Sequence, residues 1–280
     1  MQSKSLTFVV MLVLIFSLAL PTSIAKATPP NCTCVEYVKA YFGITEAVGN
    51  AKDMGTWLTN HGFSQVSSPQ AGVVAVMQPG FPGADATYGH VGIIDSVSDQ
   101  GSNWKITLRG ANQSSGSAFS EFGCSNVRNT SWSAYSKTNT KIKYYKPFKF
   151  AIKSAMTSLY FDVEGGSTND GAYVVGWSYH GGNNQLFNFI SYGSGVYRII
   201  ARNSAKCIQP QNTSQGARLV QKKCTGSNIE KWILYSGYVL KNSQTGYVVD
   251  LAGGSSNPGT WIVQWSSHGG NNQKWALESK

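Results

Sequence analysis

The C-terminal half contains one eleven-residue pattern twice, as WSYHGGNNQLF over residues 177–187 and as WSSHGGNNQKW over residues 265–275. The second copy is displaced by 88 residues, and Asp162 returns at Asp250 with the same displacement. A displacement of 88 residues accommodates two units of about 44 residues, so one more divergent unit lies between the two copies. It is visible over residues 216–234. Three units of about 44 residues predict a closed repeat fold, because each unit buries its apolar face against its neighbours.

Each unit alternates short apolar segments with glycine-rich turns, a pattern typical of β-hairpins. Each also ends in a motif of Gln or Glu, any residue and an aromatic residue, at 185–187, 230–232 and 273–275. With these motifs, residues 148–280 resemble the ricin-type β-trefoil lectin domain. The resemblance implies that the three aromatic residues, Phe187, Trp232 and Trp275, belong to the core of an all-β domain.

Sugar recognition needs a hydrogen-bonding carboxylate and a flat aromatic face for the apolar side of the ring. In the first and third units an aspartate precedes a tryptophan by 15 residues, and an asparagine follows it by seven. These positions resemble the sugar subsites of ricin-type lectins, and we expect two sites: Asp162, Trp177, Asn184 and Gln185 in the first unit, and Asp250, Trp265, Asn272 and Gln273 in the third. The second unit has Gln209, Lys222 and Glu230 instead, so we expect no sugar site there.

Residues 28–147 have a different pattern. Apolar side chains recur at helical spacing over residues 34–42 and stop at Gly43, and a second short helix is indicated over residues 51–58. Apolar strand patterns follow at 72–76, 90–94, 104–108 and 141–145. Helices followed by antiparallel strands predict an α+β domain.

Three residues of this half could form a catalytic site. Cys34 occupies the first turn of the expected helix, where unpaired amides and the helix dipole favour a thiolate. His90 begins an apolar strand and could serve as its base. Asn112, after the next strand, could orient the imidazole with its amide oxygen.

The same region resembles the CHAP domain, a papain-related cysteine amidase and peptidase module of peptidoglycan hydrolases. Cys34 is followed at the third and fourth positions by Tyr37 and Val38, and residues 89–93 read Gly-His-Val-Gly-Ile, as in that family. Many members have Glu-x-Asn after the next strand, whereas this chain has Gly110-Ala111-Asn112. The resemblance implies a Cys34, His90 and Asn112 site that lacks the acidic residue.

The chain has five cysteines, an odd number for an exported protein. Cys207 and Cys224 lie within one repeat unit and are expected to pair. Spacing alone leaves Cys32, Cys34 and Cys124 to share one disulfide and one thiol. The CHAP resemblance selects Cys34 as the nucleophile, which leaves Cys32 to pair with Cys124. No cysteine or histidine spacing suggests zinc, and we expect neither a metal nor a cofactor.

Residues 1–27 contain Lys4, an apolar run and a small-residue site near Ala25, as in a secretory signal peptide. Its removal leaves 21 basic and 13 acidic residues, a net charge of +8. The basic residues are scattered, which argues against nucleic acid and favours an anionic cell-surface or wall polymer. We therefore expect a monomer that is secreted or associated with the cell wall and has no later membrane span.

Composition excludes disordered, fibrous and helical-bundle proteins, since 41% of residues are hydrophobic and 30 are glycines. The leading hypothesis is a secreted peptidoglycan amidase or endopeptidase held on glycan by its lectin half. The alternative is a catalytically inactive secreted lectin, or a toxin, that binds cell-surface glycans.

Overall fold

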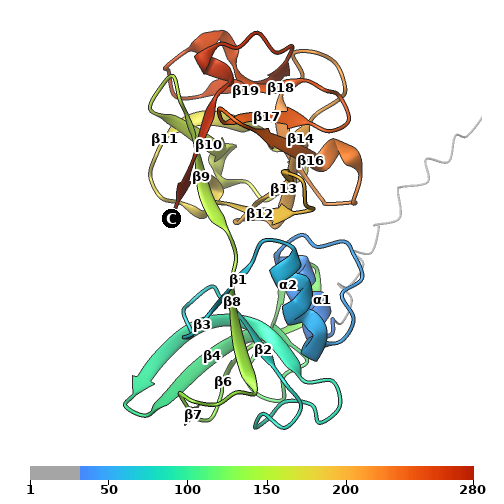
Figure 1. The fold of residues 1–280 in the computed structure, drawn as a ribbon, viewed down its shortest axis with the longest axis vertical. Helices are drawn as coiled ribbons and strands as arrows, with labels where there is room; N and C mark the ends of the chain where they lie inside the picture. Colours follow the sequence, from blue (N-terminus) through green and yellow to red (C-terminus); the bar gives the residue numbers. More distant parts are fainter. Residues whose placement is uncertain (1–31) are drawn as a thin grey trace, which may run out of the picture.

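The computed structural model describes residues 32–280, so the expected signal peptide lies outside the described residues. Two lobes follow one another along the chain (Figure 1): the N-terminal lobe combines helices with a sheet, and the C-terminal lobe is built from strands. Among the described residues, no helix has the length and apolar character needed to cross a membrane.

The first helix, α1 (Cys34–Tyr41), begins at a reciprocal cap. The Thr33 hydroxyl accepts a hydrogen bond from the Glu36 amide, and the Glu36 carboxylate accepts one from the Thr33 amide. After the helix, Gly43 adopts a φ of +60°, as expected of a helix stop. A 3₁₀ turn (Ala51–Asp53) leads into α2 (Met54–Asn60), so the structure contains both predicted helices.

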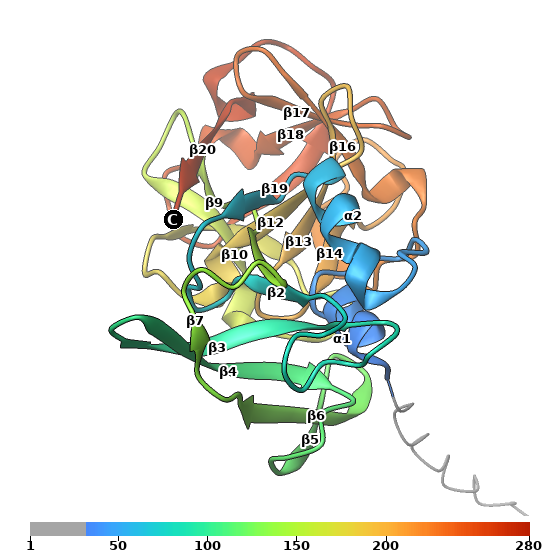
Figure 2. The same cartoon turned by 60° about the horizontal axis from the view of Figure 1, so that its bottom comes forward.

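The N-terminal sheet is antiparallel, with strand order β1-β8-β2-β3-β4-β6-β5 and β7 paired to β4. The predicted strands correspond to β2, β3, β4 and β8, whereas the other four carried no clear sequence pattern. The bounds are β1 (Ser64–Val66), β2 (Val74–Met77), β3 (His90–Gln100), β4 (Asn103–Ala111), β5 (Ala118–Glu121), β6 (Cys124–Ser131), β7 (Tyr135–Ser136) and β8 (Ile142–Lys146). Helix α1 packs on β3, as Figure 2 shows.

The C-terminal lobe has three successive units of four strands, the arrangement of a β-trefoil. The first unit comprises β9 (Lys149–Ser154), β10 (Leu159–Val163), β11 (Val174–Ser178) and β12 (Phe187–Ser191). The second comprises β13 (Val196–Ala201), β14 (Lys206–Pro210), β15 (Leu219–Lys222) and β16 (Lys231–Tyr235). The third comprises β17 (Val239–Asn242), β18 (Val248–Leu251), β19 (Thr260–Trp265) and β20 (Trp275–Ser279). Short 3₁₀ turns, Glu164–Gly166, Asn183–Gln185, Asn228–Glu230, Ala252–Gly254 and Asn271–Gln273, connect some of these strands.

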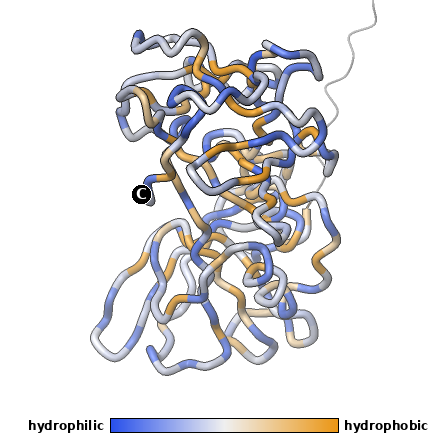
Figure 3. Tube along the Cα trace, turned by 45° about the horizontal axis from the view of Figure 1, so that its top comes forward, coloured by the Kyte–Doolittle hydropathy of each residue, from blue (hydrophilic) through white to orange (hydrophobic). Residues whose placement is uncertain are grey.

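The trefoil core contains the three motif aromatics, as the sequence predicts. Phe187, Trp232 and Trp275 are completely buried in one hydrophobic cluster. The indole N–H groups of Trp232 and Trp275 donate to the carbonyls of Ile208 and Val249, at 2.8 and 3.1 Å. Apolar segments run through the interior of both lobes in Figure 3. Burial of the three rings stabilises the fold, and the two indole hydrogen bonds satisfy the polar atoms that burial removes from water.

The two lobes share a hydrophobic cluster, which fits the absence of a flexible linker between β8 and β9. Phe42 and Ile44 of the N-terminal lobe pack in one cluster with Ile190 and Ile200 of the trefoil. A Cβ on Gly43 would lie 2.9 Å from both the Ala205 carbonyl oxygen and the Cys224 sulfur. Glycine at position 43 therefore permits both the left-handed turn and the close approach of the lobes.

Candidate functional site

Cys34 is the first residue of α1 and the free thiol among the described cysteines. Its neighbour Cys32 is bonded to Cys124, with the Cα atoms 5.3 Å apart. Cys207 pairs with Cys224, so both predicted disulfides are present. Cys34 is buried near the helix start, which leaves its sulfur in a protein environment rather than in bulk water.

His90 is the first residue of β3 and is held there by the conformation of Gly89. The φ of Gly89 is +72°, and a Cβ at this position would lie 2.2 Å from the Met77 carbonyl oxygen. A side chain at position 89 would therefore disrupt the β2–β3 pairing that fixes His90. The backbone conformation and the close approach of Met77 therefore explain why the residue before His90 is glycine.

Burial sets the protonation states of both groups. Desolvation raises the pKa of the Cys34 thiol, although hydrogen bonds from the backbone at Val91 and Val35 oppose it. The helix start was expected to lower the pKa of Cys34 and favour a thiolate. The structure shows the opposite direction, because the loss of water around the sulfur outweighs the effect of the helix start. Desolvation also lowers the pKa of His90 to about 4. The resting pair is therefore a neutral thiol and a neutral imidazole near pH 7.

Cys34 and His90 line one cavity of about 900 Å³, together with the segment after β4. Thr33 and Asn50 border it on the helix side, and Tyr88 borders it on the loop before β3. No hydrogen bond joins the Cys34 sulfur to the His90 ring in this arrangement. The cavity nevertheless gives a substrate access to both side chains.

Asn112 does not make the expected contact with His90. It lines the same cavity, but it follows the end of β4 with a φ of +55°, and its side chain is exposed. The chain turns at this residue, and no hydrogen bond joins the Asn112 amide to the His90 imidazole. The Nε2 atom of His90 is enclosed and has no hydrogen-bond partner among the described residues.

Gln113 occupies the interior in place of Asn112. Its Nε2 atom donates to the carbonyls of Leu108, Gly110 and Arg128, at 3.1, 3.0 and 2.9 Å. A Cβ on Gly110 would lie 3.0 Å from this Nε2 atom. The Gln113 amide thus occupies space into which a side chain at position 110, such as the family's glutamate, would extend.

Trp132 connects Gln113 to His90. Its indole N–H donates to Gln113 Oε1 at 3.2 Å, and its ring centroid lies 5.5 Å from that of His90, with the planes 33° apart. The tryptophan therefore covers the imidazole and contributes to its burial. Neither Gln113 nor Trp132 was among the residues that the sequence singled out.

In the trefoil, the first unit contains a cluster around Asp162. The His180 Nε2 atom lies 3.1 Å from Asp162 Oδ2, and Asn184 Nδ2 donates to Asp162 Oδ1 at 2.9 Å. Burial raises the pKa of Asp162, while the contacts with His180 and Asn184 lower it. Trp177 is a diagonal cross-strand neighbour of Asp162, and its ring is 44% exposed. Carboxylate, imidazole, amide and exposed ring are thus gathered in one place.

The third unit repeats this geometry. His268 Nε2 lies 3.2 Å from Asp250 Oδ2, and Asn272 Nδ2 donates to both oxygens of Asp250 at 3.0 Å. Trp265 has the same diagonal relation to Asp250 and is similarly exposed. The structure therefore brings together the aspartate, tryptophan and asparagine expected for each unit.

Gln185 and Gln273 do not fit the expected role of sugar contacts. Both side chains are almost completely buried. Gln185 accepts hydrogen bonds from the His180 and Gly181 amides and donates to the Ser178 carbonyl. Gln273 accepts from the His268 amide and donates to the Ser266 carbonyl and to Asp250 Oδ2, each at 2.9 Å. Their amides hold the histidine loops in place and present no free polar atom to a ligand.

A metal centre finds no support in the described part of the chain. Residues 32–280 contain no group of three or more His, Cys, Asp or Glu side chains placed to hold a metal ion.

Comparison with known families assigns both lobes. The CHAP domain model matches residues 25–112, and the ricin-type β-trefoil lectin domain model matches residues 148–275. The chain carries a CHAP domain followed by a ricin-type lectin domain. No curated protein matches the chain.

Three similar solved structures each cover about half of the chain. The designed threefold-symmetric protein ThreeFoil is 33% identical, covers 47% of this chain and 99% of its own, and has a TM-score of 0.45. The C-half of the earthworm R-type lectin, in complex with GalNAc, is 25% identical, with coverages of 48% and 100% and a TM-score of 0.41. The ricin B-like lectin of Macrolepiota procera, in complex with lactose, is 23% identical, with coverages of 47% and 95% and a TM-score of 0.41.

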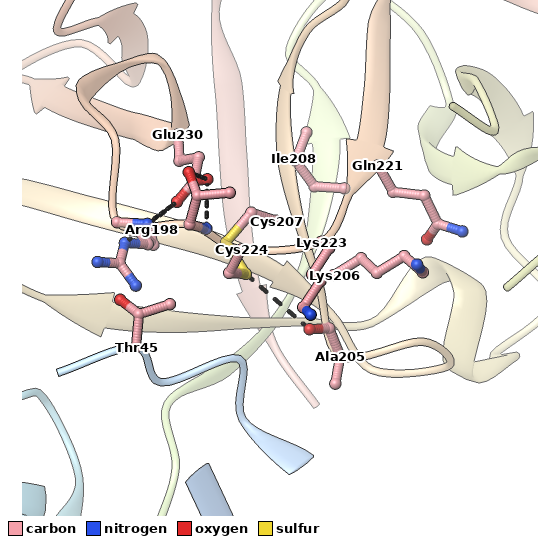
Figure 4. The surroundings of a disulfide bond; sticks show 12 residues. Thr45, Arg198, Ala205, Lys206, Cys207, Ile208, Gln221, Lys223, Cys224 and Glu230 are labelled. Carbon is pink, nitrogen blue, oxygen red and sulfur yellow. Dashed lines mark hydrogen bonds and ion pairs between the residues drawn. A yellow bond between two sulfur atoms is a disulfide. The ribbon is translucent and has the colours of Figure 1, made fainter. Parts of the chain in front are cut away.

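The second unit of the lectin domain faces the CHAP domain. Glu230, which replaces the motif glutamine, accepts hydrogen bonds from the Thr225 and Gly226 amides at 2.7 and 3.0 Å. A Cβ on Gly226 would lie 3.3 Å from the Thr45 hydroxyl of the CHAP domain. Figure 4 shows Thr45 near Arg198, with Glu230 on the other side of that arginine.

Arg198 extends this contact between the domains. It is almost fully buried, its Nε atom lies 3.7 Å from Glu230 Oε2, and its Nη2 atom pairs with Glu46 of the CHAP domain. The Tyr192 hydroxyl donates to the same Glu46 at 2.8 Å. The unit for which no sugar site was expected therefore contributes to the domain interface.

His180 and His268 contact the two aspartates but were not among the site residues expected from the sequence. Both lie inside the repeated pattern and show the same 88-residue displacement as the aspartates. Both side chains are about half exposed, whereas Asp162 and Asp250 are nearly enclosed. The histidines and tryptophans thus form the accessible surface of each cluster.

Proposed function

We propose that this protein is a secreted, monomeric hydrolase of amide bonds in peptidoglycan, held on its substrate by the lectin domain. The CHAP match implies an amidase or peptidase. The observation that carries the proposal is the cavity that Cys34 and His90 share at the start of α1 and β3. A helix-start cysteine and a strand-start histidine also suit a papain-like relationship. We assign residues 28–147 to catalysis and residues 148–280 to glycan binding.

The mechanism begins from the neutral pair. His90 accepts the thiol proton as the Cys34 sulfur attacks the scissile carbonyl carbon, and a tetrahedral intermediate forms. Its collapse breaks the C–N bond, and the imidazolium donates its proton to the leaving amine. A water molecule, deprotonated by His90, then attacks the thioester carbonyl; the C–S bond breaks, the carboxylic acid leaves, and the Cys34 sulfur takes the proton back from the imidazolium. Because Nε2 is enclosed, we assign the proton transfers to Nδ1 of His90.

For glycan binding, we propose two sites. One comprises Asp162, Trp177, His180 and Asn184, and the other comprises Asp250, Trp265, His268 and Asn272. The exposed tryptophans would stack against the apolar faces of sugar rings, and the polar groups would bind hydroxyls. Two weak sites on one rigid domain would gain avidity on a polymeric wall.

The test is digestion of purified peptidoglycan, followed by mass spectrometry of the new termini. We expect free amines and carboxylates at a single type of amide bond, with Cys34→Ala as the inactive control. New reducing sugar ends without new amines would contradict the proposal, since they would show glycan rather than amide cleavage.

A second candidate is an inactive lectin. It is favoured by the His90 Nε2 atom, which has no acceptor, and by the Asn112 side chain, which does not reach it. Binding of peptidoglycan without release of any fragment by the wild-type protein would support this alternative.

A further inference from the structure

Three equivalent residues of the lectin repeats meet around the pseudo-threefold axis. Tyr173, Arg218 and Trp261 lie at or just before the start of the third strand of their units. Each pairs with the residue two positions beyond its equivalent in another unit: Tyr173 with Val220, Arg218 with Val263, and Trp261 with Val175. This cyclic register closes a triangle, so the three side chains converge although they are distant in sequence.

The Arg218 guanidinium lies between two aromatic rings. Its Cζ atom is 3.4 Å from the Tyr173 ring centroid and 4.5 Å from that of Trp261. Its Nε atom is shielded from solvent without a hydrogen-bond partner, and the guanidinium forms no ion pair within residues 32–280. The cation is therefore fixed by stacking, while its charge is not matched by any described carboxylate.

The triangle adjoins both proposed sugar sites. Gly259, two residues before Trp261, lies against Trp177, since a Cβ there would be 3.6 Å from that ring. Gly216, two residues before Arg218, has the same relation to Trp265, at 3.2 Å. A glycan chain bound at either site could therefore place a neighbouring unit on the triangle.

We propose that Tyr173, Arg218 and Trp261 form a third, on-axis site for a sugar unit that carries a carboxylate. A guanidinium presents a planar set of N–H donors that matches a carboxylate, and a stacked guanidinium is already ordered before binding. Trp261 is 56% exposed and offers a surface for the sugar ring. The site goes beyond the proposed function, because it uses neither aspartate cluster and needs no catalysis.

The test compares two probes with the same sugar chain, trigalacturonic acid with free carboxylates and its uncharged methyl ester, titrated into the full protein by NMR. Trp177→Ala/Trp265→Ala serves as the background, so that the aspartate clusters do not contribute. We expect the acid to bind more tightly than the ester. We further expect Arg218→Gln to weaken binding of the acid about tenfold, with Lys223→Gln, which removes one exposed charge from the same domain, as the matched control.

Trp261→Ala provides a second variant should Arg218→Gln fail to fold, and thermal unfolding monitors both. Trp261→Ala should also weaken binding of the acid, whereas Lys223→Gln should not. Equal binding of acid and ester, or equal losses in Arg218→Gln and Lys223→Gln, would overturn the site. Displacement of the acid by acetate at equal concentration would show that the site binds carboxylates in general, and would overturn its assignment to a sugar unit. Because the background variant lacks both tryptophans, failure of this site leaves the proposed glycan sites untouched.

Discussion

At the level of single residues, the burial of His90 determines how it can act. Its pKa of about 4 keeps the ring neutral, and hence able to accept a proton, through the neutral range. The neighbouring thiol is also neutral at rest, because burial raises its pKa. A proton transfer coupled to attack suits this pair better than a preformed thiolate.

The lowered pKa of His90 also predicts how stability depends on pH. An unfolded His90 would titrate near 6.5, so the unfolded chain binds more protons than the folded one between pH 6.5 and pH 4. Stability contributed by the neutral ring is fully present above pH 6.5 and is lost as pH falls toward 4. We expect a loss of about 3 kcal/mol over this range.

Urea unfolding of wild type and His90→Gln at several pH values measures this loss. The difference in unfolding free energy between the two proteins should change by that amount from pH 7.5 to pH 4. A difference that stays constant with pH would show that His90 titrates normally in the folded protein.

Trp132 is the residue that we expect to keep His90 neutral. Replacing it with alanine would admit water beside the imidazole, so the pKa of His90 should rise from about 4 toward 6.5. NMR titration of the His90 ring measures this directly, and Phe148→Ala, which removes an exposed ring elsewhere, is the control. The pH profile of wall hydrolysis should shift in the same direction. An unchanged pKa in Trp132→Ala would remove the tryptophan from this positioning role.

Only part of this site could be predicted from the sequence. Cys34 and His90 were predictable because the helix cap and the Gly-His turn are local features. The hydrogen bond expected between Asn112 and His90 is absent from the structure: Asn112 follows β4 in a left-handed conformation and is exposed, and local sequence does not reveal such a turn. Gln113 and Trp132 could not be found, because their roles arise from packing between segments 19 residues apart.

At the level of elements, the trefoil repeats show which positions are interchangeable. The repeated aspartates, tryptophans and asparagines could be read from one displacement, since equivalent strands place them identically. The glutamines of the same motif recur just as faithfully, but they are buried; both accept hydrogen bonds from backbone amides, and Gln273 also donates one to Asp250. Repetition therefore predicted which positions are equivalent, whereas the burial of each side chain could be known only from the structure. Strand β6 escaped prediction because its sequence, CSNVRNTS, is mostly polar.

We expect glycan retention to depend on two units. Trp177→Ala and Trp265→Ala should each shorten retention on immobilised glycan, and the double variant should elute without retention. The reason is avidity: two linked sites should bind a polymer more tightly than one site by a factor of about 10² or more. Lys222→Ala, at the equivalent position of the second unit, is the matched control and should change little. Strong retention of the double variant on a neutral glycan would contradict the assignment of these sites.

At the level of the whole molecule, the domains are joined by a buried charge network. Arg198 interacts with Glu230 of its own domain and with Glu46 of the CHAP domain. Glu46→Gln should lower the free energy of unfolding by roughly 2 kcal/mol, because it leaves part of a buried charge uncompensated. Calorimetry should show a lower melting temperature than for Glu164→Gln, which changes an exposed acid without an ion pair. Equal melting temperatures would show that the interface does not rely on Glu46.

We propose that a thiol in one domain cuts the polymer that the other domain holds. The most direct measurement incubates insoluble peptidoglycan with wild type or Cys34→Ala and quantifies, in the same tubes, the protein that pellets and the fragments released. We expect equal pelleting of both proteins, fragment release by wild type, and none by Cys34→Ala. Equal release by the two proteins would contradict the account.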